Sequence, residues 1–385
     1  MSESSPPGPT RRRKLRRRRT PHGAPPCTLT IDPEAPRPSM HLIGYGPDQV
    51  TEEDLERPSL IRKHLDKWPV VWVDVAGLGD EQILREIGEI FDIHGLALED
   101  VVNVHQRSKV EEYEDHIFIV SRMITPGERF ETEQLSLFLG RGWVLTFQER
   151  PGDCLDPLRR RIRHARGLVR KMGADFLAYA LLDAVVDGYF PMLEQCEADL
   201  DRLEEQIMRV PRSDVISHLH AMRHTLQMLR RSILPLREAL SSLLRDQPPQ
   251  FTDQVLPYLR DCQDHTVQIL DEIDTQRELC ASLADLHLSN ISHRMNEVMK
   301  VLTIFATIFI PIGVIAGIYG MNFNTERSPW NMPELNWAFG YPFALGLMAA
   351  VAAVLLFLFR RWGWLGGAPA AKRRGEPPAG EGDRG

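Results

Sequence analysis

Two long uncharged, apolar runs constrain this chain more than any other feature of its sequence. No charged residue occurs from Val301 to Thr325 or from Trp337 to Phe359, and most residues of each run are apolar. Each run reaches the ~20 residues that an α-helix needs to cross a bilayer. We therefore expect two transmembrane helices, at about 300–320 and 338–360. The alternative is two helices buried in a large soluble core, which the polar loop between the runs disfavours.

The basic residues beside the two runs predict the topology. Arg294 and Lys300 precede the first run, and Arg360 and Arg361 follow the second. Lys and Arg accumulate on the cytoplasmic side of membrane proteins. We therefore expect a multi-pass protein of the plasma (inner) membrane, with both termini in the cytoplasm and the short loop outside. The five cysteines form no CxxC pair, which is typical of free thiols in a reducing compartment.

The N-terminal segment has a different charge from the rest of the chain. Residues 1–26 hold eight basic residues and one acid, which gives them a net charge of +7. Because the whole chain has a net charge of −7, the other 359 residues carry −14. No apolar stretch follows the block from Arg11 to Arg19, so it is not a signal peptide. A solvated tail without a binding role is the simplest interpretation. Of the two binding roles, anionic membrane lipids fit a cytoplasmic tail better than nucleic acid does.

The part before the first run changes character near Asp175. Strand-like segments occupy 69–78, 116–124, 135–141 and 143–149, and Asp80 is placed to cap a helix. Beyond Asp175 the sequence predicts helices at about 175–209 and 212–245, and a third from 252 to 319. If unbroken, the third would be about 100 Å long and would enter the membrane as a stalk.

We therefore expect an α+β membrane protein with a cytosolic α/β domain, a long helical stalk and two C-terminal transmembrane helices. The expected segments are a disordered basic, proline-rich tail (1–40), the α/β domain (41–174), cytosolic antiparallel helices (175–250), a stalk helix that continues into the first transmembrane helix (251–320), an external loop (321–337), the second transmembrane helix (338–360) and a cytosolic tail (361–385).

One stripe of the stalk helix repeats at the spacing of a coiled-coil seam. From Asp285, steps of three and four residues reach Leu288, Ser292, Met295, Met299, Leu302, Ala306, Ile310, Gly313, Gly317 and Gly320. A packed helix seam is one interpretation, because small residues let helices approach closely in lipid. Asp285 and the nearby Asn296 favour a water-filled axis instead, since unpaired carboxylates destabilise a dry interface.

Three stretches of the chain resemble the CorA-type magnesium channels. They are MNEVMKVLTIFATIFIPIGVIAGIYGMNF at 295–323, MPELNWAFGYP at 332–342 and LEDVVNVHQRSKVEEYEDHIFIV at 98–120. The first ends in a Gly-Met-Asn triplet at the outer end of the first apolar run. The resemblance covers roughly 41–365 and implies a funnel-shaped homopentamer, with the stalk helix lining a central pore and the second membrane helix outside it.

The resemblance also implies which residues form the pore. The outer mouth is formed by Gly320, Met321 and Asn322. The constriction is lined by Asn296, Met299, Leu302 and Ile310, although the family more often has Met where Ile310 stands. Asp285 forms an acidic ring at the cytosolic end. By residue type alone, Asn322 could instead end the helix as a cap, but amide oxygens suit the bound water of a hydrated Mg²⁺ without trapping the ion.

A regulatory magnesium site is implied by the same resemblance. Asp100 and Asp261 correspond to carboxylates that bind this ion between neighbouring subunits, with Glu99 beside them. Feedback of this kind suits passive entry, because a divalent ion gains ~4.6 kcal/mol from a potential of 100 mV.

The sequence therefore predicts a passive, potential-driven channel for magnesium uptake, gated by internal magnesium. The alternatives within the family are transport of cobalt or nickel, or transport of zinc, which proton coupling could drive. A membrane-anchored coiled-coil scaffold is the alternative of another class, although a scaffold does not need Asp285, Asn296 and Asn322 on its axis. No enzyme is predicted, since the sequence contains no catalytic constellation and no GxxxxGK[ST] phosphate-binding loop.

Overall fold

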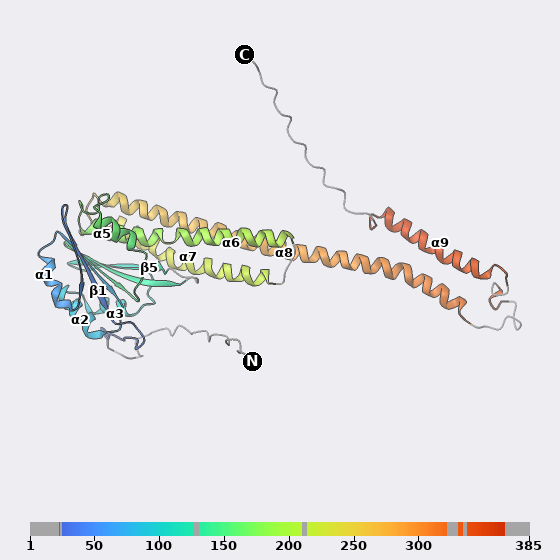
Figure 1. Ribbon diagram of the computed structural model, residues 1–385, viewed down its shortest axis with the longest axis horizontal. Coiled ribbons are helices and arrows are strands. Elements are labelled where there is room, and N and C mark those ends of the chain that lie inside the picture. Colours follow the sequence, from blue (N-terminus) through green and yellow to red (C-terminus); the bar gives the residue numbers. More distant parts are fainter. Residues whose placement is uncertain are drawn as a thin grey trace, which may run out of the picture. The chain divides into compact units, whose positions relative to one another are not determined.

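The computed structural model describes residues 23, 25–125, 131–209, 214–321, 330–333 and 337–365. The chain forms two compact units, Met1–Asp285 and Leu286–Gly385. Helix α8, Leu256–Tyr319, contributes residues to both units (Figure 1).

A seven-stranded sheet forms the centre of the first unit, in the order β2-β1-β3-β7-β6-β5-β4. Its strands are β1 (Ser39–Tyr45), β2 (Val50–Leu55), β3 (Val70–Ala76), β4 (Lys109–Glu112), β5 (His116–Ile124), β6 (Thr132–Gly140) and β7 (Trp143–Gln148). Neighbouring strands are antiparallel except β3 and β7, which are parallel with Trp72 opposite Val144. The four strands predicted from the sequence are confirmed as β3, β5, β6 and β7.

Both faces of the sheet are buried, because side chains alternate between two cores along each strand. On β5, Ile117 and Ile119 pack with helices α5 to α8, whereas Phe118 and Val120 pack with α2 and α3. Fully burying a side chain of this size contributes about 1.5–3 kcal/mol. The first unit is therefore a three-layer structure with the sheet in the middle (Figure 1).

The helices before β4 cover one face of the sheet, and those of the first unit after β7 cover the other. The first set comprises η1 (Pro58–Leu60), α1 (Arg62–Leu65), α2 (Glu81–Ile90) and α3 (Gly95–Val102). The others are α4 (Asp156–Arg163), α5 (Ala174–Asp187), α6 (Phe190–Arg209), α7 (Val215–Asp246) and the first part of α8, while α9 (Gly340–Arg361) belongs to the second unit. The predicted cap is confirmed, since Asp80 Oδ1 accepts from the N–H groups of Gln82 and Ile83 at 3.1 and 3.2 Å.

Two expectations about the first unit need correction. The helix expected at 175–209 is interrupted between α5 and α6, because Pro191 has no N–H for the carbonyl four residues earlier. The buried Tyr189 stands at this break, and its hydroxyl donates to the carbonyl of Arg122 at 2.6 Å. The segment expected to be disordered is folded from residue 25 onward: Leu29 is buried against the sheet, and β1 begins at Ser39.

Asp175 fixes the start of α5 to the segment that leads into α8. Its Oδ2 accepts from the backbone N–H and the hydroxyl of Thr252, at 3.0 and 2.6 Å. In the first turn of α8, Tyr258 packs edge-on against Phe176 with ring centroids 5.3 Å apart. These contacts hold α5 and α8 beside each other, which matters for the site described below.

Replacing Asp175 should loosen this connection. Asp175→Ala should lower the free energy of unfolding by about 3 kcal/mol, because two Thr252 donors lose a charged acceptor in a buried place. Asp175→Asn, which keeps one acceptor oxygen, should lose less. Thermal unfolding of the purified protein in detergent measures both. Equal midpoints for the wild type and Asp175→Ala would show that this carboxylate does not stabilise the fold.

Candidate functional site

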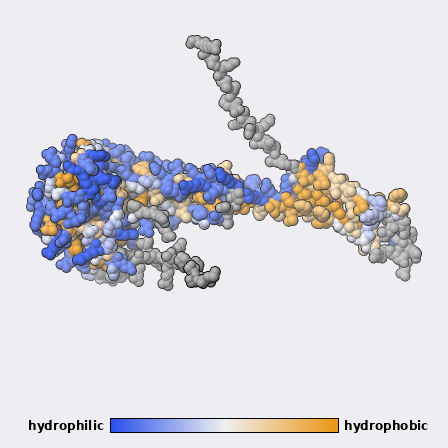
Figure 2. All heavy atoms as spheres, in the orientation of Figure 1, coloured by the Kyte–Doolittle hydropathy of each residue, from blue (hydrophilic) through white to orange (hydrophobic). Residues whose placement is uncertain are grey.

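Three described segments are long and apolar enough to cross a membrane, and their burial differs sharply. The most apolar window of Ala174–Arg209 is 61% buried, whereas the windows of α8 and α9 are 0% and 11% buried. The segment made of α5 and α6 is therefore part of the core of the first unit. Figure 2 shows apolar side chains gathered on the later part of α8 and on α9. Uncovered apolar surface of this extent is typical of a segment solvated by lipid.

The ends of α9 carry the residues that anchor helices at membrane surfaces. Tyr341 is exposed in its first turn, and Trp362 follows its last residue and is also exposed. At 1.5 Å per residue they are roughly 30 Å apart along the axis, the thickness of a bilayer's hydrocarbon core. Aromatic rings of this kind gather at the two membrane surfaces.

The basic ends of the two apolar helices lie together in the second unit. Lys300, where the apolar part of α8 begins, donates from Nζ to the carbonyl of Gly363 at 3.5 Å. Gly363 directly follows the Arg360-Arg361 pair and Trp362. The helices are thus antiparallel neighbours with their positive charges at one end, the arrangement that the sequence predicted.

The predicted pore stripe of α8 lies on the face that α9 leaves uncovered. The partly covered residues of this part of α8 recur at helical spacing and define one face: Lys300, Ile304, Thr307, Ile308, Pro311, Ile312, Ile315 and Tyr319. At 100° per residue, the stripe falls on the opposite side. Met299, Leu302 and Ile310 are 55%, 62% and 64% exposed. A Cβ atom added at Gly313 or Gly317 would meet nothing within 4 Å, so the small-residue part of the stripe is also open.

A polar residue of the stripe and a polar residue beside it lie along the same helix. Asp285 and Asn296 are both exposed on α8. At its C-terminal end the helix stops at Tyr319, and the N–H of Gly320 still donates to the carbonyl of Ala316 at 2.9 Å. Met321 is exposed, and Asn322 lies outside the described residues.

Asp100, expected at a regulatory site, already has two donors on its carboxylate. It lies on α3, where Oδ1 accepts from Gln106 Nε2 at 2.6 Å and Oδ2 accepts from the ammonium of Lys109. Its neighbour Glu99 accepts at Oε2 from the backbone N–H of Cys27, at 2.9 Å. The folded part of the N-terminal segment therefore contacts Glu99.

Asp261 has different neighbours in the same chain. It is exposed on α8, where its charge contributes, after burial, to raising the pKa of Asp187 at the end of α5. One chain therefore holds Asp100 beside β4 and Asp261 beside α5, with separate sets of partners. Their carboxylate oxygens fit Mg²⁺ chemically.

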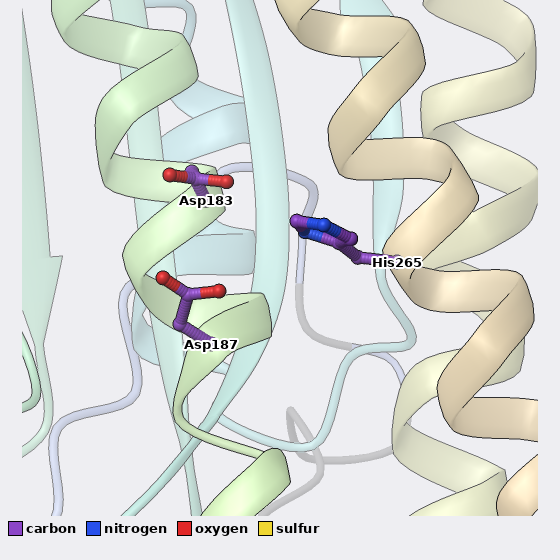
Figure 3. A group of neighbouring side chains, drawn as sticks. All are labelled: Asp183, Asp187 and His265. Carbon is purple, nitrogen blue, oxygen red and sulfur yellow. The ribbon is translucent and has the colours of Figure 1, made fainter. Parts of the chain in front are cut away.

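A metal-compatible group lies near Asp261, and the sequence analysis missed it. Asp183 and Asp187 from α5 face His265 from α8, and one ligand atom of each lies within 4.8 Å of the others (Figure 3). The i,i+4 spacing of the two aspartates, which places them on one helix face, was the available signal. Two carboxylate oxygens and an imidazole nitrogen could hold a divalent transition metal. Burial, followed by the charge of Asp187, raises the pKa of Asp183 to about 6.

Comparison with known proteins gives a consistent result. Residues 69–361 match the family described as "CorA-like Mg2+ transporter protein". The "Cobalt/magnesium transport protein CorA" of Thermotoga maritima is 42% identical over 347 residues, which cover 89% of this chain and 97% of that protein. The protein of the same name from Methanocaldococcus jannaschii is 27% identical, covering 80% and 95%. The solved complete structure of the CorA magnesium transporter from M. jannaschii superposes with a TM-score of 0.72 at 25% identity, covering 85% and 98%.

Removing a carboxylate from the group of Asp183, Asp187 and His265 should stabilise the metal-free protein and weaken its stabilisation by a metal ion. Without metal, Asp183→Asn should raise the free energy of unfolding, because a charge disfavoured by burial is removed. The expected increase is about 1 kcal/mol, since water that reaches this carboxylate reduces the effect. The stabilisation gained on adding Co²⁺ should fall, because a ligand is lost. Thermal unfolding with and without Co²⁺ measures both effects. Asp201→Asn, on the exposed face of α6, is the control and should change neither.

Proposed function

The chain belongs to the CorA-like Mg2+ transporter family, and on this premise we propose that it is a passive channel that carries Mg²⁺ into the cell. One observation carries the proposal: the stripe of α8 with Met299, Leu302 and Ile310 is uncovered on the face opposite α9, and Asn296 is exposed beside this stripe. A helix in lipid gains nothing by placing Asn296 and Asp285 on an open face. The same stripe becomes useful when several copies surround a common axis and water fills it.

The proposed assembly is a homopentamer in which α8 lines the pore and α9 packs outside it. Gly313 and Gly317 support close approach of neighbouring α8 helices, since small residues favour helix packing in lipid. The number five comes from the resemblance to the family. In this proposal both termini are in the cytoplasm, which is supported by the position of Lys300, Arg360 and Arg361 at one end of the membrane helices.

The proposed ion path runs from an amide ring to an acidic ring. Asn322, with Gly320 and Met321, forms the outer mouth and accepts hydrogen bonds from water bound to the ion. Met299, Leu302 and Ile310 form apolar rings, which close a pore by expelling water when it narrows. Asp285 then attracts the ion at the cytosolic end. The membrane potential supplies the driving force, so hydrolysis of a nucleotide is not required.

Closure is proposed to follow from binding of internal Mg²⁺ between subunits, through Asp100 of one copy and Asp261 of the next. A net charge of −14 outside residues 1–26 makes neighbouring copies repel each other. A cation held between two carboxylates relieves that repulsion and favours the compact, closed state. Binding shifts this equilibrium only by its difference in affinity for the two states.

The preference of the protein among divalent ions is best measured by comparing their fluxes directly. The relatives named for cobalt and magnesium transport support Mg²⁺ and Co²⁺ as substrates. Uptake into proteoliposomes should be compared for Mg²⁺, Co²⁺, Ni²⁺ and Zn²⁺, with and without a proton gradient. Uptake of Zn²⁺ that depends on the proton gradient would favour the zinc alternative. Absence of all flux from well-assembled protein would favour the scaffold.

Removing the amide at the outer mouth should stop transport. Asn322→Ala should reduce Mg²⁺ uptake at least tenfold while the oligomer stays intact, because the ring that receives the hydrated ion is lost. Asn324→Ala, two residues further in the same loop, is the matched control and should transport normally. Wild-type uptake by a folded Asn322→Ala protein would refute the assignment of the outer mouth.

Removing the proposed bridge should weaken closure without removing conduction. Asp100→Ala combined with Asp261→Ala should conduct at internal Mg²⁺ concentrations that close the wild type, and Mg²⁺ should protect it less from proteolysis. Asp264→Ala removes another acidic residue of α8 that is exposed, and should behave like the wild type. Identical protection and current inhibition in the double variant and the wild type would exclude these two residues as the sensor.

A further inference from the structure

We propose that Lys109 is a counter-ion built into the regulatory site, which a divalent cation must displace from Asp100, so that Lys109 sets the cation concentration at which the protein responds. The inference rests on the proposed role of Asp100 and adds a competing residue to it. Lys109 is the first residue of β4 and lies nine residues after Asp100.

The ammonium of Lys109 bridges two carboxylates. Its Nζ donates to Asp100 Oδ2 and to Glu111 Oε1. The second oxygen of Asp100 accepts from Gln106 Nε2. Each side-chain oxygen of Asp100 therefore has a protein donor before any ion arrives. A cation that takes Oδ2 as a ligand either replaces the ammonium or binds directly beside a positive charge.

The surrounding contacts hold Lys109 in this position. The ammonium lies 5.6 Å from the centroid of the Phe118 ring, and its side chain is 28% exposed. Backbone pairing of β4 with β5 places Lys109 opposite Val120. The residue is therefore a fixed cation, unlike a solvated surface lysine that swings away at little cost.

The two carboxylates are positioned independently of Lys109. The amide of Gln134 donates to the backbone carbonyl of Asp100 at 2.9 Å, and its own carbonyl accepts from the N–H of Gln106 at 3.2 Å. The hydroxyl of Tyr113 donates to Glu111 Oε2 at 3.1 Å. Removing the ammonium would therefore leave two carboxylates near their present places, with more negative charge and with Asp100 Oδ2 and Glu111 Oε1 no longer bonded to the ammonium. Such a site attracts a divalent cation more strongly than the present one.

The size of the effect follows from charge alone. A unit charge and a divalent ion about 5 Å apart repel each other even in water-like surroundings, enough for about a tenfold change in affinity. Lys109→Met should therefore lower the Mg²⁺ concentration of half-maximal response by about tenfold. Lys109→Arg keeps the charge and should stay close to the wild type.

The experiment measures the half-point, which is the Mg²⁺ concentration at which the full-length protein reaches half of its maximal protection from proteolysis. The midpoint of thermal unfolding is a second readout. Lys63→Met, on the exposed helix α1, removes the same charge elsewhere in the unit and should leave the half-point unchanged. Lys109→Gln should shift it in the same direction as Lys109→Met and replaces that variant if it fails to fold. In an Asp100→Asn background, removing Lys109 should have much less effect, since the two residues act on one site.

The outcomes separate this inference from the proposed sensor. A wild-type half-point for Lys109→Met and Lys109→Gln, together with a raised one for Asp100→Ala, would overturn the role of Lys109 and leave the sensor standing. An unchanged half-point for Asp100→Ala would overturn the sensor itself. A tenfold decrease for Lys109→Met that Lys63→Met does not reproduce supports both.

Discussion

The second unit depends on one constraint: a single chain cannot cover the apolar surface of its own α8. The helix α9 covers one face of α8, and the opposite face has nothing in the described part of the chain to pack against. In water, each such side chain would cost about 1.5–3 kcal/mol relative to burial. Lipid and further copies of the chain are the surroundings that remove this cost. The proposed pore is then a consequence of which residues stand on the face that α9 leaves free.

The first unit meets the same constraint in the opposite way. Its sheet is covered on both faces, and even the apolar segment formed by α5 and α6 is used as core. Asp175 and Thr252 then fix α5 against α8, which brings carboxylates of α5 together with His265 of α8. Burial of charge in this place is unfavourable without a cation, so the packing of the fold creates the binding potential of the site.

The sequence predicted features that depend on local pattern and missed those that depend on contacts between distant segments. The two apolar runs, the strands at the centre of the sheet and the Asp80 cap were predictable from composition and periodicity. The edge strands β2 and β4 were not, because VTEEDL and KVEE carry too many charges to show strand alternation. Neither His265 opposite Asp183 nor Lys109 on Asp100 was found, since both pairings arise only after folding. The role of Asn322 stays a prediction from the sequence.

The charges on β2 and β4 have a further consequence. These strands are the two edges of the sheet, where unpaired backbone groups can recruit a strand from another molecule. The acids of β2 and the Lys109, Glu111 and Glu112 side chains of β4 oppose such pairing through charge and hydration. In the proposed assembly, where copies of the chain stand side by side, this guards against fusion of neighbouring sheets into an aggregate.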